Sequence, residues 1–426
     1  MAAPCEIVTD NTARLEEWIY GFGGRFAFIL LGSNVKRFYP DAGATLGTVY
    51  SPRRRAVAST VSVMVLEEAT HPVWSQPEGV FPDNRPDRFY PVGLTMDGEI
   101  RRLLPNHYLD FSTWQSVRQY PPPDVVLEEI QPGDVRNAVA QMVQCIRFQI
   151  RAVASNASRI YMPLTAGMDS RMLLACAQEV RERIEFITFD YLASGRQRKW
   201  LVDLDIAKRL AKLFCLSHRV VPVPVVPPSG EALKYLQRIG FSGGAGKARD
   251  FYLANCRHLD MDAAWLSGFG VEVCRVNLYW PKDDKPLHVL SLQELHRKMR
   301  VPAGDDMIGA INQLRDGVPT GSVSQFLSLF YLENRLGCWA SPHLYGAAPF
   351  RINILPLCHR TVLDLMVRLP SEYKRQGRLP QDLIALAWPE LSCLPYNDYP
   401  PMKRLVEQAK TRAYSWLHSA SIGRTR

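Results

Sequence analysis

The fold is decided by the stretch Pro163-Leu164-Thr165-Ala166-Gly167-Met168-Asp169-Ser170-Arg171. It begins at the end of residues 160–164, a short apolar run that we expect to form a strand, and it leads into residues 172–180, whose composition is helical. Where a strand turns into a helix, the first helical turn presents unpaired N–H groups and a partial positive charge. The stretch is therefore a candidate phosphate-binding loop.

The residues of this loop have the chemistry that a phosphate group requires. Ala166 and Gly167 let the backbone approach an anion, and Thr165 and Ser170 add hydroxyl donors. Asp169 can cap the helix or orient a phosphate that is bound to Mg²⁺. The alternative is a tight turn in which the serine and the aspartate act only as caps. The residues expected to bind phosphate are Leu164, Thr165, Ala166, Gly167, Met168, Asp169 and Ser170.

Strand-like and helix-like segments alternate around this loop. We expect strands at residues 160–164, 184–189, 220–226 and 263–266, and helices at residues 135–150, 172–180 and 202–214. Such alternation implies right-handed crossovers and a parallel sheet. From about residue 290 the pattern is mainly helical, with candidates at residues 291–298, 323–336, 362–369 and 381–387.

The first 120 residues have a different texture, with short apolar and β-branched segments between turns. We expect strands at residues 26–31, 48–50 and 56–65. Pro121-Pro122-Pro123 forms a stiff break after them. The prediction is a small, mainly β domain over residues 1–122, followed by an α/β domain with a helical C-terminal part over residues 130–426.

The composition excludes several classes of protein. The net charge of +9 favours anionic ligands such as nucleotides, although a solvated basic surface is the alternative. The nine cysteines include no C-x-x-C pair, so neither a disulfide framework nor a zinc site is expected. An aromatic-and-glycine RNA-binding signature is absent, so a nucleic-acid partner is not expected. The sequence has neither a signal-peptide pattern nor an apolar run of about 18 residues, and a cytoplasmic protein without a membrane partner is expected.

The loop resembles the S-G-G-x-D-S pyrophosphate loop of the asparagine synthetase-like ATP pyrophosphatases. Thr165 replaces the first serine and keeps a hydroxyl, whereas Ala166 replaces the first glycine. The resemblance implies a protein that binds ATP and Mg²⁺ and cleaves ATP between the α- and β-phosphates. It also implies the fold of the adenine nucleotide α-hydrolases, which contains this loop.

Two further segments are similar to the same family. Residues 186–190 match the T-F-S strand end that holds adenine, which implies that Thr188 and Phe189 contact the nucleotide. Residues 266–272 resemble the S-G-D-G-A-D-E segment, which implies that Gly268 and Gly270 lie at the phosphates. In this segment Phe269 stands in place of an acid, so the resemblance leaves Asp169 and Glu272 to hold Mg²⁺.

Three charged or polar positions near these segments leave alternatives open. Arg275 lies one helical turn beyond Glu272, where it can pair with Glu272 or clamp a phosphate. Asp203 begins a segment similar to the family's D-x-x-x-A-x-x-x-A helix and is either a helix-face charge or part of the phosphate environment. A glycine-rich basic turn at residues 243–250 is either a flexible loop or a contact for phosphate or substrate.

The last third of the chain adds candidate catalytic residues. Residues 330–335 are similar to the family's L-E-x-R segment, which implies that Glu333 is a general base or substrate orienter with Arg335 as its partner. The alternative for Glu333 is an exposed helix ion pair. Lys374, in a segment similar to the family's C-terminal helices, can stabilise an oxyanion, and the alternative is an exposed lysine.

The front of the chain resembles the second half of a class II glutamine amidotransferase domain, at residues 24–28, 41–43 and 58–60. The nucleophile of that family is a cysteine directly behind the initiator methionine, whereas Cys5 lies behind Pro4. We therefore expect a shielding or docking layer without glutaminase activity.

Taken together, the resemblances imply an ATP-dependent ligase that forms amide bonds through an acyl-adenylate. Its partners would be a small-molecule or peptide carboxylate and an amine or ammonia, and its cofactors ATP and Mg²⁺. The alternative is a catalytically inactive nucleotide-binding or scaffold protein of the same fold. The oligomeric state is left open, a homodimer included.

Overall fold

The computed structural model describes residues 12–65, 90–122, 125–191, 198–223, 254–275, 291, 305–318, 322–344 and 352–397, apart from residues 96, 256 and 343. Cys5, the turn at residues 243–250 and nearly all of the helix expected at residues 291–298 lie outside these ranges.

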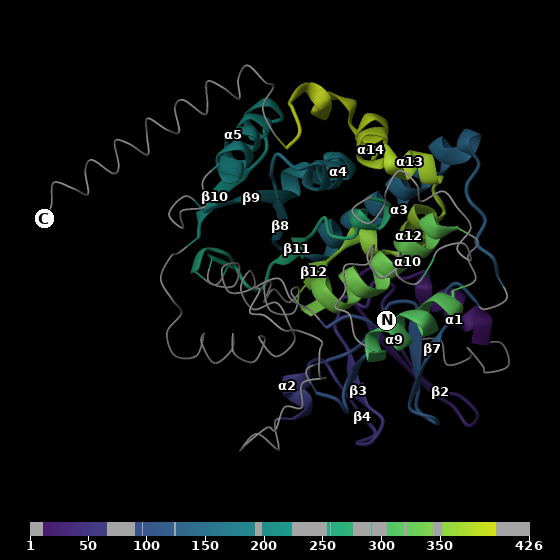
Figure 1. Ribbon diagram of the computed structural model, residues 1–426. Helices are drawn as coiled ribbons and strands as arrows, with labels where there is room; N and C mark the ends of the chain where they lie inside the picture. Colours follow the sequence, from purple (N-terminus) through teal and green to yellow (C-terminus); the bar gives the residue numbers. More distant parts are fainter. Residues whose placement is uncertain are drawn as a thin grey trace, which may run out of the picture.

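A five-stranded parallel sheet forms the centre of the larger part of the molecule (Figure 1). Its strands, in spatial order, are β10 (His218–Pro222), β9 (Ile184–Asp190), β8 (Ile160–Pro163), β11 (Ala264–Leu266) and β12 (Ile352–Ile354). Every neighbouring pair is parallel, which confirms the predicted α/β class. The fifth strand, β12, was not expected, because three residues are too few to show a period.

The strand order reverses at the middle of this sheet. After β8 the chain adds β9 and then β10 on one side, and it returns to place β11 on the other side of β8. In open α/β sheets, the point of reversal is where the loops after two neighbouring strands diverge and leave room for a ligand. The segments that follow β8 and β11 therefore flank the place where this fold favours binding.

Helices that precede and follow these strands bury one face of the sheet. The helices α3 (Val135–Asn156), α4 (Met168–Cys176) and α5 (Arg198–Leu213) share a hydrophobic cluster with Ile160, Met162 and Phe186. The alternate residues Tyr161 and Ile187 join Trp265 in a second cluster, as the period of two in a strand requires. The predicted helix over residues 135–150 is confirmed, and Val139, Met142, Val143, Ile146 and Ile150 are its buried stripe.

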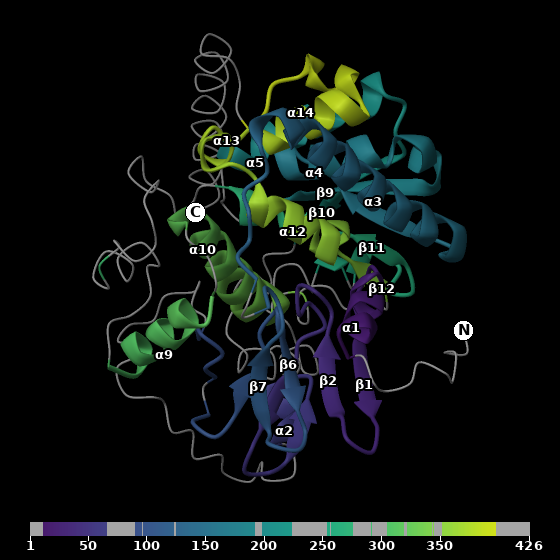
Figure 2. The same cartoon turned by 90° about the vertical axis from the view of Figure 1, so that its right-hand side faces the viewer.

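The C-terminal region is helical, as predicted. It contains α9 (Asp305–Asp316), α10 (Val323–Phe330), the π-helix η7 (Tyr331–Ala340), α12 (Arg360–Arg368), α13 (Ser371–Arg375) and α14 (Leu379–Ala387). Figure 2 shows that α4 and α14 lie at the end of the molecule farthest from the antiparallel strands. Short 3₁₀ helices link several elements: η2 (Pro132–Asp134), η3 (Gln178–Arg183), η5 (Val271–Cys274), η8 (Pro356–Cys358) and η9 (Pro389–Cys393).

The first 120 residues begin with helix α1 (Thr12–Tyr20), and two small antiparallel sheets follow it in the chain. One sheet has the order β1 (Ala27–Leu31), β2 (Lys36–Pro40), β6 (His107–Asp110) and β7 (Gln115–Arg118). The other has the order β4 (Ala56–Ala58), β3 (Val49–Ser51) and β5 (Arg101–Arg102). The strand predicted over residues 56–65 was wrong beyond Ala58, because Thr60 accepts a hydrogen bond from the Val63 amide and caps the short helix α2 (Val61–Met64).

The antiparallel layer and the parallel-sheet part share one core. Leu15, Ile19 and Tyr39 belong to the same hydrophobic cluster as the buried stripe of α3. At Gly337 of η7 the two parts meet so closely that a Cβ atom would lie 2.4 Å from Cδ of Pro105. None of the described helices is long and apolar enough to cross a bilayer.

Candidate functional site

The predicted phosphate loop leaves the sheet at Leu164, which is fully buried. The Leu164 amide donates to the Ile187 carbonyl at 2.8 Å, and its carbonyl accepts from Oγ1 of Thr188 at 2.6 Å. The Thr188 hydroxyl also lies 2.8 Å from Nε2 of His218. Burial holds the pKa of His218 below its usual value, with Lys208 adding to the effect. Leu164 and Thr188 thus fix the start of the loop, and their contact with a nucleotide stays a prediction.

The next residues fold the loop around the hydroxyl of Ser170. Its Oγ atom lies 2.8 Å from Oγ1 of Thr165 and 3.3 Å from the Thr165 amide nitrogen. The Gly167 amide donates to Oγ1 of Thr165 at 3.0 Å. The amides of Thr165 and Gly167 therefore have hydroxyl acceptors within the loop, and a phosphate oxygen would have to replace them.

A carboxylate from helix α5 completes this loop. Oδ1 of Asp203 accepts from the Ala166 amide at 3.0 Å. Asp203 thus contacts the loop directly, and its place in a metal and phosphate environment stays a prediction. The Asp203 carboxylate therefore occupies the amide of Ala166.

Asp169 and Arg275 join the loop after β8 to the segment after β11. The guanidinium of Arg275 donates to both carboxylate oxygens of Asp169, at 3.3 Å for one of them and closer for the other. The Asp169 side chain is 32% exposed and the Arg275 side chain is 28% exposed, so solvent or a ligand reaches both. Gly268 lies against the Asp169 backbone, where a Cβ atom would be 3.2 Å from the carbonyl oxygen. The two predicted segments are therefore in contact.

Glu272 and Gly270 form the turn that leads to Arg275. Gly270 has a φ of +117°, a left-handed conformation that favours glycine, and its amide donates to Oε2 of Glu272 at 3.3 Å. Arg275 pairs with Asp169 in place of the expected pair with Glu272, and its role as a phosphate clamp stays a prediction.

An aromatic and cationic wall borders the site from the π-helix η7. The guanidinium of Arg335 lies 3.9 Å from the ring centre of Trp339, which contacts Phe269 edge-on with ring centres 6.3 Å apart. Burial raises the pKa of Tyr331 strongly; the charges of Glu272 and Asp169 also raise it, and Arg335 lowers it. The acids and the arginine act on Tyr331 because the two loops and η7 are neighbours.

The resemblance implies a magnesium ion, and the residues of this site fit it poorly. Asp169 has both oxygens on Arg275, and Phe269 stands where the family has an acid. No group of three histidine, cysteine, aspartate or glutamate side chains that could hold a metal occurs among the described residues. Of the two residues predicted to hold Mg²⁺, Asp169 is already paired with Arg275, which leaves Glu272.

Glu333 lies elsewhere, in a buried contact with the antiparallel layer. Its oxygens accept from Arg118 at 2.6 and 2.8 Å, and Oε1 also accepts from Nδ2 of Asn106 at 2.8 Å. Burial alone would raise the pKa of Glu333, but Arg118, His107 and Asn106 hold it below its usual value. The alternative of an exposed helix ion pair was wrong, because the carboxylate is 0% exposed. A role as general base stays a prediction, and this conformation gives it no route to an amine in solvent.

Lys374 is also buried, so the alternative of an exposed lysine was wrong. Its Nζ donates to the Val367 carbonyl at 2.6 Å and to Oγ of Ser328 at 3.2 Å. Burial lowers the pKa of Lys374 to about 8, although Glu129 and Cys274 act in the other direction. No contact places it at an oxyanion, and that role stays a prediction.

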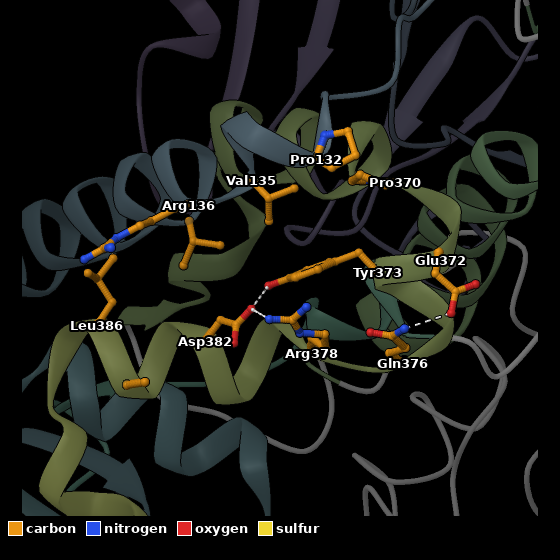
Figure 3. Close-up of a pocket in the computed structure, with 12 residues that line it drawn as sticks. Pro132, Val135, Arg136, Pro370, Glu372, Tyr373, Gln376, Arg378, Asp382 and Leu386 are labelled. Atoms are coloured by element: carbon orange, nitrogen blue, oxygen red, sulfur yellow. Dashed lines mark hydrogen bonds and ion pairs between the residues drawn. The ribbon is translucent and has the colours of Figure 1, made fainter.

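A groove of about 570 Å³ lies between α3, α13 and α14, with none of the predicted site residues in its lining (Figure 3). Tyr373 and Arg378 both point to Asp382, at 2.9 and 3.4 Å. These three polar groups bind one another, and the groove lies apart from both segments that resemble the ATP pyrophosphatases. The edge of the sheet at β8 and β11 is therefore the stronger candidate.

Asp203 and Tyr331 are the residues of the site whose roles the sequence left undecided or unnoticed. Asp203 lies 37 positions beyond Ala166, and nothing local connects the two. Tyr331 lies two residues before Glu333 in a segment that was already a candidate, and this proximity was the available signal.

The sequence matches none of the protein-family models with which it was compared, and a search of the curated proteins finds no match either.

Proposed function

We propose that this protein binds ATP with its diphosphate at the carboxyl edge of β8 and β11, and that it activates a carboxylate as an acyl-adenylate for transfer to an amine. The observation that supports this proposal best is the strand order. It brings the loop of residues 164–170 beside the segment of residues 267–275 at the point of reversal. The resemblance of both segments to the ATP pyrophosphatases supports the reaction.

The chemistry requires little from the protein beyond position and charge. A carboxylate oxygen of the substrate forms a bond to the α-phosphorus, and the bond from that phosphorus to the bridging oxygen breaks and releases pyrophosphate. The amides of the loop and the first turn of α4, with the hydroxyls of Thr165 and Ser170, would hold the departing charge. The amine nitrogen then bonds to the acyl carbon, AMP leaves, and the nitrogen loses a proton to solvent.

A second candidate is a nucleotide-binding protein that has no catalytic activity. Two observations favour it: Glu333 is committed to Arg118, and the amides of Thr165, Ala166 and Gly167 already have acceptors within the protein. Such a protein would bind ATP without cleaving it.

A pyrophosphate-release screen over pairs of carboxylates and amines separates these candidates. We expect release that depends on an added carboxylate, and a fall of at least about 10-fold in Ser170→Ala because a donor to the developing charge is lost. Ser392→Ala, which changes an exposed serine, is the matched control. ATP binding without AMP formation in any mixture would favour the inactive candidate, and a protein that binds no ATP would contradict both.

A further inference from the structure

We infer that the guanidinium of Arg275 supplies, at the edge of β8 and β11, the positive charge that a divalent cation would otherwise bring. The diphosphate site then needs no metal ion to bind its ligand. This inference rests on the proposed diphosphate site and deepens it, because it names the group that carries the counter-charge.

The ion pair between Asp169 and Arg275 lies at the start of helix α4. Asp169 is the second residue of α4, at the helix end where the backbone has a partial positive charge. Arg275 reaches it from the segment after β11 and occupies both of its oxygens. A planar guanidinium has five N–H donors, so a pair with Asp169 leaves donors for phosphate oxygens on the same side chain.

The acidic side chains near Asp169 already accept hydrogen bonds from backbone amides. Oε2 of Glu272 accepts from the Gly270 amide, and Oδ1 of Asp203 accepts from the Ala166 amide. Glu272 and Asp203 thus each have a donor within the protein, and Asp169 is paired with the positively charged guanidinium of Arg275. Phe269 adds an apolar ring where the related segment has a carboxylate. These carboxylates are therefore neutralised or hydrogen-bonded by fixed groups of the protein, without the need for a bound cation.

A second arginine lies beside the loop. Arg335 borders the same site from η7, with its guanidinium over Trp339. Because Arg275 and Arg335 both act near the loop, a bound diphosphate would meet two fixed cations in a site that is partly shielded from water. Fixed charges in such a site stabilise an anion more than they would in bulk solvent.

Calorimetric titration of the full chain tests this inference, with inorganic pyrophosphate and with ATP as probes, each in Mg²⁺ and in EDTA. For the wild-type protein we expect dissociation constants that differ by less than about 3-fold between the two conditions. Arg275→Ala should weaken binding in EDTA by about 10- to 100-fold, since a charge-assisted bidentate contact is lost. Added Mg²⁺ should restore part of that loss, because the Asp169 carboxylate is then released.

Two variants make the result specific. Asp169→Asn should bind pyrophosphate in EDTA as tightly as the wild type or more tightly, because Arg275 keeps its charge and loses the group that neutralises it. A metal-ligand role for Asp169 predicts the opposite, a loss of binding in Mg²⁺. Arg378→Ala removes an equivalent charge from another arginine–aspartate pair, and it should leave both constants unchanged.

The two possible failures are distinguishable. Wild-type protein that binds pyrophosphate only with Mg²⁺, together with an unaffected Arg275→Ala variant, would overturn this inference and leave the proposed function intact. Wild-type protein that binds neither probe under either condition would overturn the inference and the proposed function together.

Discussion

Replacing Arg118 with methionine should destabilise the protein strongly, because it leaves the Glu333 carboxylate without its cation. The Glu333 side chain is 0% exposed and Arg118 only 9% exposed, so water does not replace the lost partner. Among the residues that the structure describes, Asn106 alone would still donate to the carboxylate. Removing one partner of a buried ion pair typically costs about 3–5 kcal/mol, a large share of the about 5–15 kcal/mol that stabilises a typical domain.

The assay is urea unfolding followed by tryptophan fluorescence and circular dichroism, with the double variant Arg118→Met/Glu333→Leu as the decisive comparison. Because the double variant removes both charges, its loss of unfolding free energy should be only about 1–2 kcal/mol, part of it from the Asn106 amide left unpaired. A loss below about 1 kcal/mol in Arg118→Met would refute the reasoning, as would a double variant less stable than either single one.

The same pair predicts a dependence on pH. The pKa of Glu333 in the folded protein is held below the usual 4.5, chiefly by the charge of Arg118 acting against burial. The pair therefore stabilises the protein fully above pH 4.5, and this contribution is lost as the pH falls through the lowered value. The difference in unfolding free energy between wild type and Glu333→Gln should shrink below pH 4.5, whereas a constant difference would contradict the assignment.

Further predictions concern the buried lysine and the contact between the two parts of the chain. Burial lowers the pKa of Lys374 from 10.5 to about 8, so the unfolded chain binds the proton more strongly between these values. Relative to Lys374→Met, the wild type should gain on the order of 3 kcal/mol as the pH rises through that window; a flat difference in urea unfolding would argue against the buried amine. Gly337→Ala should cost about 1–3 kcal/mol, since its Cβ would meet the Pro105 ring, and Gly309→Ala, which meets nothing within 4 Å in α9, should stabilise by about 0.5–1 kcal/mol. Equal melting temperatures for these two glycine variants would contradict the close packing at Pro105.

Periodicity predicted the parts of the fold in which local pattern and burial agree. The stripe of α3 was found because its apolar residues repeat with the period of a helix, and the strands β8, β9 and β11 were found as short apolar runs between helical segments. The short strand β12 was missed, since it depends on pairing with β11 more than on its own residues. The buried state of Glu333 was also missed, because its partner Arg118 lies 215 positions away and belongs to the antiparallel layer.

In the candidate site, too, the local features could be predicted from the sequence and the long-range contacts could not. The loop after β8 could be found from its residues, because small and hydroxyl side chains between a strand and a helix have a direct chemical meaning. The contact between Arg275 and Asp169 could not be found in this way, since it depends on the strand order that places β11 beside β8. Long-range order of this kind is set by packing of the whole sheet, which no local pattern contains.

The most direct test of the proposed site is hydrogen–deuterium exchange with and without ATP, read at peptides that cover the loop of residues 164–171 and the segment of residues 267–275. We expect ATP to slow amide exchange in both peptides, because phosphate oxygens accept from these amides, and to leave exchange in α13 and α14 around the groove unchanged. Protection confined to α13 and α14, or no protection at either segment with ATP bound, would contradict the proposed site.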